Sequence, residues 1–320
     1  MITITGASGF LGSNLVARCD ERRMRSRALM RNPRGFEAEL VEVEPLPSGG
    51  LSSVNARQVV GSTSIIHAAA RAHRMNESGP DALAAYRAVN VEGTRALIAA
   101  MAEAGVRRLV YVSSIKAIGE RSPNGPLTPR DARHPEDPYG ISKAEAEDVV
   151  LEAHARGVID AVIIRPVLVH GPGAKGNLDR LLRAVRRGMP LPLGSVRNRR
   201  SLVGVRNLAD ALLHAATVDV DLRALSTNVF HIADDGVVST RRLVELMAEG
   251  MGLTPRLLPL PRAIAELGAS LLGKRAVARR LFDDLEVDDQ DFRRELRWTP
   301  TLSLEDGIRE MARAYAAAHP

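Results

Sequence analysis

The stretch Ile2-Thr3-Ile4-Thr5-Gly6-Ala7-Ser8-Gly9-Phe10-Leu11-Gly12 decides the fold of this chain. Its first residues alternate apolar and polar side chains as a short strand does, and a helical pattern begins after Gly9. Gly6 permits the tight turn, Gly9 lets the backbone approach a pyrophosphate, and Gly12 lets the helix pack closely on the strand. In this context the glycine loop predicts a dinucleotide-binding unit.

The start of the helix supplies the binding groups of such a unit. Its first backbone N–H groups have no partner within the helix, and the helix dipole adds partial positive charge. A plain turn between strand and helix, without a ligand, is the alternative interpretation. The predicted contacts to the cofactor from this segment are Gly6, Ser8, Gly9, Phe10, Leu11 and Gly12.

Length and composition narrow the class of protein. A chain of 320 residues with 45% hydrophobic and 26% charged residues is typical of a soluble globular protein of one or two domains. Cys19 is the only cysteine, so a disulfide framework or thiolate metal cluster within the chain is excluded, and we expect no metal site. No apolar run is long enough to cross a bilayer, and no secretory signal is evident. We therefore expect a cytoplasmic protein without an integral membrane segment.

The charge balance leaves two interpretations open. Lysine and arginine number 44 against 38 acids, which gives a net charge of +6. This excess fits either a generally arginine-rich composition or a phosphate-bearing ligand. Only 3% of the residues are aromatic, so the stacking platforms of single-strand binders are missing. We expect no nucleic-acid partner.

The second strand carries the signal for the type of nicotinamide cofactor. We predict this strand over Ser26–Met30, and NAD enzymes usually place an acid at its end to bind the ribose hydroxyls. Here no acid occurs between Glu21 and Glu37, and Arg31 stands at the expected position. A guanidinium binds a 2′-phosphate well but accepts no hydrogen bond. The sequence therefore favours NADP(H), with NAD(H) as the alternative.

Two further segments are predicted to approach the cofactor. Ser64–Ala70 is typical of a buried strand, and its small end residues Ala68, Ala69 and Ala70 leave room for a ligand near the backbone. His67 lacks a second ligand at metal spacing, so we interpret it as a hydrogen-bonded histidine at the strand end. A long helix is predicted over Asp81–Ala104, with Gly105 ending it.

A serine at a strand end and a tyrosine and a lysine on the next helix follow along the chain. A strand from Arg108 ends in Ser113-Ser114, and a helix capped by Asp137 begins at Pro138. Tyr139 and Lys143 are four residues apart, so they share one face of that helix. A tyrosine with an ordinary pKa of about 10 is a poor base at neutral pH, and we expect the Lys143 ammonium and the cationic oxidised nicotinamide to lower that pKa.

Taken in order, these segments resemble the extended short-chain dehydrogenase/reductases, the family of nucleotide-sugar epimerases and dehydratases. The resemblance covers nearly the whole chain. It implies that Ser114 orients the reacting oxygen of a sugar while Tyr139, beside Lys143, transfers its proton. It also implies cofactor contacts from Tyr139, Lys143 and three further residues, namely Asn90, Val112 and Pro166.

One departure from the family pattern bears on the reaction. Dehydratases carry an Asp-Glu pair after the serine, and here Ile115 and Lys116 stand in its place. The segment instead resembles bacterial members of polysaccharide pathways that act on UDP-N-acetylhexosamines. The resemblance implies substrate contacts from Lys116, Asn177, Leu193 and Arg200, although Lys116 is equally interpreted as a solvated lysine, and Arg197 and Arg199 compete with Arg200 for the diphosphate.

The predicted fold is α/β, a doubly wound parallel (Rossmann) sheet with a smaller C-terminal α+β substrate lobe. We assign residues 1–170, with 204–233 returning, to the dinucleotide-binding domain and residues 171–203 and 234–320 to the nucleotide-sugar lobe. The predicted activity is reduction of a 4-keto group on a UDP-hexose or UDP-N-acetylhexosamine for polysaccharide precursor synthesis. A UDP-sugar 4-epimerase with tightly bound NAD and a non-catalytic NADP-binding redox sensor are the alternatives. The family also implies a homodimer through the helices at Asp81–Ala104 and Tyr139–His154.

Overall fold

A single parallel sheet organises the molecule. The computed structural model describes residues 1–32, 39–71, 80–262, 264 and 281–319. Seven strands pair in the order β3-β2-β1-β4-β5-β6-β9, and every neighbouring pair is parallel. The strands are β1 (Ile2–Thr5), β2 (Ser26–Met30), β3 (Val41–Pro45), β4 (Ser64–His67), β5 (Arg108–Val112), β6 (Asp160–Pro166) and β9 (Val229–Ile232).

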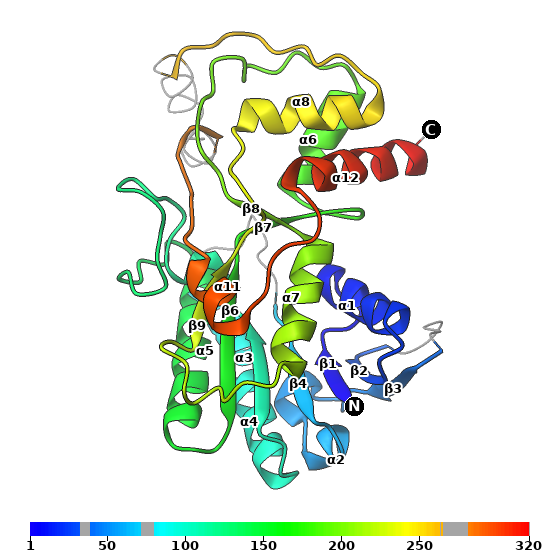
Figure 1. The fold of residues 1–320 in the computed structure, drawn as a ribbon, viewed down its shortest axis with the longest axis vertical. Coiled ribbons are helices and arrows are strands. Elements are labelled where there is room, and N and C mark those ends of the chain that lie inside the picture. The colour runs from blue at the N-terminus through cyan, green and yellow to red at the C-terminus, as the bar shows by residue number, and fades with distance from the viewer. Residues whose placement is uncertain (33–38, 72–79, 263, 265–280, 320) are drawn as a thin grey trace.

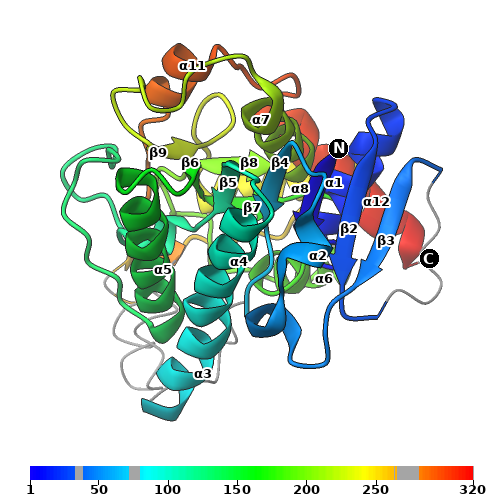
Figure 2. The ribbon, with the colours of Figure 1, turned by 90° about the horizontal axis from the view of Figure 1, so that it is seen from below.

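Helices cover both faces of this sheet, which confirms the predicted doubly wound α/β class (Figure 1). On one face lie α1 (Phe10–Glu21) and α7 (Val205–Thr217), and on the other lie α2 (Ala56–Val59), α4 (Glu92–Glu103) and α5 (Pro138–Ala155), as Figure 2 shows. Alternate residues of each strand feed the two hydrophobic cores: Ile66 packs with the α1 face and Ile65 with the α4 face. This burial on both faces explains why the strands are almost continuously apolar.

The helix predicted over Asp81–Ala104 is interrupted. It forms α3 (Pro80–Asn90) and α4, separated at Val91. The Thr94 hydroxyl donates to the carbonyl oxygen of Asn90 at 2.7 Å, and this kind of back-bonding to residue i−4 bends helices. Gly93 follows the break, and a Cβ there would lie 2.7 Å from Leu51 in the short helix η1 (Gly50–Ser53), so close packing explains a glycine inside the helix.

Beyond β6 the chain builds a smaller lobe at the carboxyl end of the sheet (Figure 1). Strands β7 (Leu168–His170) and β8 (Leu202–Gly204) form a second, parallel pair. A separate hydrophobic core joins α6 (Asn177–Arg186), α8 (Thr240–Met251) and α12 (Leu304–Ala318). The short helices η2 (Ile115–Ala117) and α11 (Gln290–Leu296) complete the described elements. The domain limits at 170, 204 and 233 remain predictions.

A buried polar cluster joins this lobe to the main sheet. The Asp234 carboxylate accepts from the backbone N–H of Gly204 at 2.8 Å and from the Asn207 amide at 2.7 Å, and it lies 3.0 Å from the ring of His170. The Asn207 side chain also donates to the carbonyl oxygen of Leu302, just before α12. These bonds tie β7, β8, α7 and the C-terminal helix together. Within the described residues, no helix is long and apolar enough to span a membrane.

Candidate active site

The glycine turn after β1 contacts the segment after β4. Gly6 has φ +72°, and a Cβ there would lie 2.7 Å from the Cα of Ala69. A Cβ on Gly12 would lie 2.0 Å from the carbonyl oxygen of Gly6. The two predicted cofactor segments, at Gly6–Gly12 and at Ala68–Ala70, are therefore neighbours at the carboxyl edge of the sheet. Both glycines are sterically required for this approach.

The first turn of α1 has the properties of a phosphate site. Its N-cap is Gly9, which has no side chain to cap the backbone N–H groups, and no acid lies in the first turn. Ser8 and Gly9 are exposed, whereas Phe10 and Leu11 are half-buried. A helix end of this kind suits a pyrophosphate, so the residues present fit a dinucleotide. In the described part of the chain, no cluster of three or more His, Cys, Asp or Glu is placed to hold a metal ion.

The helix that carries the tyrosine and lysine is held close to β5 at its first turn. Asp137 caps it as predicted, accepting from the backbone N–H of Gly140 at 2.7 Å. A Cβ on Gly140 would lie only 2.5 Å from the carbonyl oxygen of Lys116, so α5 packs directly on the η2 turn. This packing brings Tyr139 beside Ser114.

Tyr139 and Ser114 come together, but the phenol is not acidified in this structure. Burial raises the pKa of Tyr139 to about 12, and a hydrogen bond with the Ser114 side chain lowers it only in part. The edge of Tyr139 also meets the Tyr86 ring, with centroids 6.0 Å apart. The neighbouring Asp137 and Tyr86 act in the same direction as burial, and they too raise the pKa of Tyr139. The predicted lowering of this pKa by Lys143 together with an oxidised nicotinamide stays a prediction.

Lys143 is one of the most deeply buried charges of the molecule. The residue is only 1% exposed. Its Nζ donates to the Tyr111 hydroxyl at 2.6 Å and to the carbonyl oxygen of Val112 at 2.7 Å. Burial lowers the pKa of Lys143 to about 7, while the negative charge of Glu147 acts in the opposite direction. Lys143 is therefore a group that titrates near neutral pH.

Asn90 links the segments around this pair. Its side-chain oxygen accepts from the backbone N–H of Arg71 at 2.7 Å, and its amide donates to Ser142 at 2.9 Å. Ser142 in turn donates to the carbonyl oxygen of Tyr139 at 2.8 Å. Asn90 thus joins the chain after β4 to α5, and its direct contact with a cofactor stays a prediction.

The remaining predicted cofactor residues lie at the same edge of the sheet. Arg31 is exposed directly after β2, and Ala70 is exposed after β4. Pro166 ends β6, opposite Ile232 of β9. Their contacts with a ligand stay predictions.

The predicted substrate residues are divided between the site and the lobe. Lys116 is half-buried and forms ion pairs with Asp137 at 2.5 Å and with Glu120 at 2.7 Å, so it is paired with two carboxylates. Its contact with a substrate stays a prediction. Asn177 is the exposed first residue of α6, whereas Leu193 is buried in the core of the lobe. Arg200 donates to the carbonyl oxygen of Asp283 at 3.2 Å.

Of the competing arginines, Arg199 is turned outward. It pairs with Glu286 at 2.7 Å, while Arg197 bonds the carbonyl oxygen of Gly194 at 3.1 Å. A contact of Arg200 with a diphosphate stays a prediction.

Sequence reasoning missed a group of buried side chains behind the site, namely Tyr86, Thr94, Tyr111 and Glu147. Tyr111 alternates with Val110 and Val112 along β5, so its face of the sheet was readable from the strand pattern. Its contact with Lys143 was not, because it depends on which face α5 covers.

The pKa of Lys143 leads to a test by unfolding. In the unfolded chain Lys143 keeps its ordinary pKa of 10.5, whereas in the folded protein it is about 7. The unfolded state therefore binds more protons between these pH values, and stability from this residue rises with pH across that window. Lys143→Met should remove this dependence. In urea unfolding between pH 7 and 10, the free energy of unfolding of the wild type should therefore rise with pH more steeply than that of Lys143→Met, by up to about 1.4 kcal/mol per pH unit.

The matched control for this comparison is Lys175→Met, which replaces an exposed lysine and should keep the wild-type slope. Tyr139, whose pKa rises from 10 to about 12, acts in the opposite sense only above pH 10. Parallel curves for wild type and Lys143→Met from pH 7 to 10 would show that Lys143 has no lowered pKa.

Comparison with known proteins agrees with this geometry. The chain is 34% identical to a UDP-glucose 4-epimerase of Vibrio cholerae over an alignment of 325 residues. This alignment covers 99% of this chain and 96% of the relative. The chain is 27% identical, over 97% of its length and 95% of the relative, to a 4-hydroxy-2-methyl-3-oxo-4-farnesyl-3,4-dihydroquinoline-1-oxide ketoreductase of Stigmatella aurantiaca.

A solved structure and a family model extend the comparison. The structure of MoeE5 in complex with UDP-glucose and NAD matches 100% of this chain and 99% of its own, with a TM-score of 0.76 and 25% identity. The model of the NAD dependent epimerase/dehydratase family matches residues 2–229, which include the glycine turn, Ser114, Tyr139 and Lys143. The chain belongs to the NAD dependent epimerase/dehydratase family.

Proposed function

We propose that this protein is a UDP-sugar 4-epimerase that retains NAD(H) through the reaction. The observation that carries the proposal is the hydrogen bond between Ser114 and Tyr139, on the helix that also carries Lys143, at the same carboxyl edge of the sheet as the glycine turn. The Vibrio cholerae relative, similar over nearly the whole chain, is a UDP-glucose 4-epimerase. The MoeE5 structure holds UDP-glucose and NAD on the same fold.

The residues that fit the cofactor are those of the glycine turn and its neighbours. The uncapped first turn of α1 would hold the pyrophosphate, and the small residues Ala68 and Ala69 allow a ring to lie near the end of β4. When bound, NAD(H) would supply the hydride transfer at the sugar carbon.

The chain's own residues manage the proton of the C4 hydroxyl. Ser114 and Tyr139 are hydrogen-bonded to each other, so a sugar oxygen between them would be oriented by both hydroxyls. Tyr139 takes the hydroxyl proton at Oη during oxidation and gives it back during reduction. Lys143 lies four residues later on the same helix, and its positive charge would stabilise the deprotonated form of Tyr139.

The pKa of Tyr139 determines how much electrostatic stabilisation its deprotonated form needs at neutral pH. Moving a phenol from about 12 to the neutral range takes roughly 7 kcal/mol of differential stabilisation. A protonated Lys143 and the positive charge of an oxidised nicotinamide are the cations that would supply it. In the protein alone Tyr139 is therefore almost entirely protonated at neutral pH, and the added positive charge would let its deprotonated form be populated so that it can accept a proton.

A 4-ketoreductase that uses NADPH is the second candidate. The exposed Arg31 after β2 favours it, because a guanidinium can bind a 2′-phosphate. The ketoreductase of Stigmatella aurantiaca is a relative with that type of activity. Against it, the bound cofactor named for the MoeE5 structure is NAD. A non-catalytic redox sensor is less well supported, since Tyr139 and Lys143 are both present.

Substitution of the phenol tests the enzyme assignment. Tyr139→Phe removes the proton-transfer group but keeps the ring against Tyr86, so activity on UDP-glucose and UDP-N-acetylglucosamine should fall by about 10²–10⁴-fold. The activity of Ser114→Ala on the same sugars should fall less. The circular dichroism spectrum and melting temperature should stay close to wild type. Full activity of Tyr139→Phe on these sugars would contradict the proposal and favour the sensor.

The nucleotide extracted from the purified protein separates epimerase from reductase. An epimerase returns the hydride to the same sugar and has no need to exchange its cofactor, so we expect NAD(H) to co-purify with the wild-type protein. Acid extraction followed by mass spectrometry identifies it. Arg31→Ala should leave NAD(H) retention unchanged. Empty protein that binds NADPH more tightly than NADH, with the preference lost in Arg31→Ala, would support the reductase instead.

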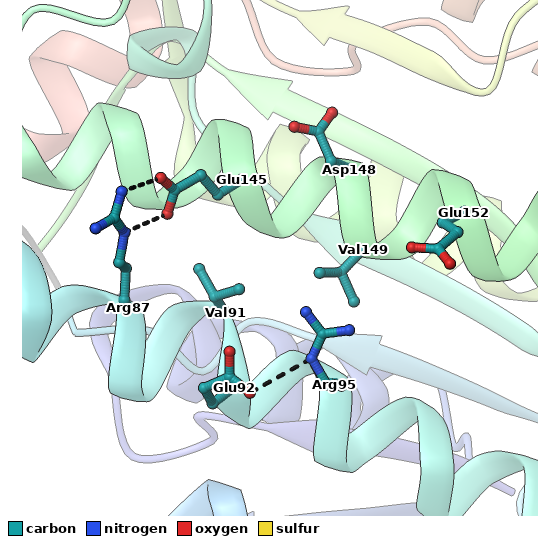
Figure 3. Close-up of a pocket in the computed structure, with 8 residues that line it drawn as sticks. All are labelled: Arg87, Val91, Glu92, Arg95, Glu145, Asp148, Val149 and Glu152. Carbon is teal, nitrogen blue, oxygen red and sulfur yellow. Dashed lines mark hydrogen bonds and ion pairs between the residues drawn. The ribbon is translucent and has the colours of Figure 1, made fainter.

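We also propose a homodimer through the face formed by α3, α4 and α5, which the family resemblance implies. Figure 3 shows a hollow between these helices, with Arg87, Glu92 and Arg95 on the α3 and α4 side and with acids, namely Glu145, Asp148 and Glu152, on the α5 side. Arg87 pairs with Glu145 at 2.5 Å across it, whereas Glu152 is 64% exposed and Arg95 is 57% exposed. In a two-fold dimer, acids of one α5 would face cations of the partner's α4.

Light scattering tests the dimer. Wild type should have twice the chain mass of 34.6 kDa, and Val149→Arg, in the hollow, should have the mass of a single chain. Val60→Arg adds the same charge at a 53% exposed valine elsewhere and should stay dimeric. A measured mass of 34.6 kDa for the wild-type protein, that of a single chain, would contradict the proposal.

A further inference from the structure

A chain of buried polar side chains runs from the catalytic lysine to the glycine turn. Lys143 Nζ donates to the Tyr111 hydroxyl at 2.6 Å, and Tyr111 is hydrogen-bonded to the Thr94 side chain. Thr94 Oγ1 lies 3.0 Å from His67 Nε2, and His67 Nδ1 lies 2.7 Å from Thr5 Oγ1. All five residues are at most 1% exposed. The chain therefore crosses α5, β5, α4, β4 and β1 without solvent.

The direction of each bond follows from counting protons. Thr94 donates its hydroxyl proton to the carbonyl oxygen of Asn90 at 2.7 Å, so it accepts from its other partners. His67 therefore donates from Nε2 to Thr94, and because burial lowers the pKa of His67 to about 3 the ring is neutral and carries no proton on Nδ1. His67 Nδ1 then accepts from the Thr5 hydroxyl, which itself accepts from the backbone N–H of Ala69 at 3.1 Å.

This count leaves one arrangement for Tyr111. Because Thr94 acts as an acceptor toward it, Tyr111 donates its proton to Thr94 and turns a lone pair toward Lys143. Two directions at Nζ are then fixed, by Tyr111 and by the carbonyl oxygen of Val112. An ammonium has three N–H groups, so the direction of the third is set as well.

We propose that Tyr111 is a positioning residue that aims the remaining N–H of Lys143 and keeps its ammonium charged. Tyr111 touches neither Ser114 nor a sugar in this role; it acts through Lys143. The same series of hydrogen bonds continues through Thr5 to the backbone N–H of Ala69, so it also links Lys143 to the loop against which Gly6 packs. The inference rests on the proposed function only for its activity readout.

The charged and titratable groups around Lys143 decide the sign of the effect. Glu147 and Tyr139 lie on its own helix, Tyr111 on β5 and His67 on β4. Glu147 is itself paired with Arg165 at 2.6 Å. Loss of the Tyr111 oxygen removes an acceptor that favours the charged lysine, so Tyr111→Phe should lower the pKa of Lys143 further.

Selective labelling makes this measurable without activity. The lysines of the chain are Lys116, Lys143, Lys175 and Lys274, so protein with ¹³C at lysine Cε gives few signals, and Lys143→Met assigns the one of interest. Wild-type Lys143 should titrate near pH 7. In Tyr111→Phe the pKa should fall by about one unit. Thr94→Val should lower it by a smaller amount, since the Tyr111 oxygen remains but is no longer oriented.

The enzyme assay gives a second, separate readout. For Tyr111→Phe we expect kcat to fall about 10-fold to 100-fold with little change in KM, and the alkaline limb of its pH profile to move to lower pH. Tyr315→Phe is the matched control, because it removes a tyrosine hydroxyl from α12 in the lobe. It should leave the Lys143 titration and the kcat profile at their wild-type values.

Other results would overturn the inference. A Lys143 pKa that rises toward its ordinary value of 10.5 in Tyr111→Phe would mean that water has entered and that Tyr111 only fills space. An unchanged pKa together with an unchanged pH profile would mean that Tyr111 does not act on Lys143. If wild-type protein has no activity on UDP-sugars, the proposed function fails, while the titration still decides the role of Tyr111.

Discussion

The contact of the Lys143 ammonium with the Tyr111 hydroxyl and the Val112 carbonyl oxygen is the constraint on which the site depends. Placing a charged group where it is only 1% exposed is costly unless good acceptors surround it. Both acceptors belong to β5, at 2.6 and 2.7 Å, so α5 has little freedom to slide along the sheet. Tyr139 lies one turn earlier on α5, and its position beside Ser114 follows from the same contact.

A second buried charge holds the same helix further along. Glu147 accepts from Ser113 at the end of β5 and forms two hydrogen bonds with Arg165 of β6. Such a pair adds little net stability, since its desolvation offsets much of its attraction, but it penalises any register in which one partner is left unpaired. With Lys143 one turn before Glu147, α5 is fixed against two neighbouring strands. The catalytic groups are thus placed by buried electrostatics as well as by hydrophobic packing.

These contacts also explain the chemical state of the site. Burial that holds Lys143 in place lowers its pKa to about 7, and burial around Tyr139 raises the phenol pKa to about 12. Each shift disfavours the charged form, so at neutral pH the phenol of Tyr139 is protonated and neutral while Lys143 is in the range where it titrates. Additional positive charge at the nicotinamide position favours the phenolate. In the proposed epimerase the deprotonated form of Tyr139 would therefore become accessible at neutral pH together with the cofactor.

The sequence by itself determined the local units: the strand Ser26–Met30, the glycine turn at Gly6–Gly12, the Asp137 cap and the tyrosine and lysine on one face of α5. These follow from alternation, helical spacing and backbone geometry, which depend on residues close in the chain. Only the tertiary structure decided the break at Val91, the partners of Lys116, the raised pKa of Tyr139 and the contact of Tyr111 with Lys143. Each of these depends on burial or on a neighbour from another strand or helix, and a hydrogen bond between residues 32 positions apart leaves no pattern in the local sequence.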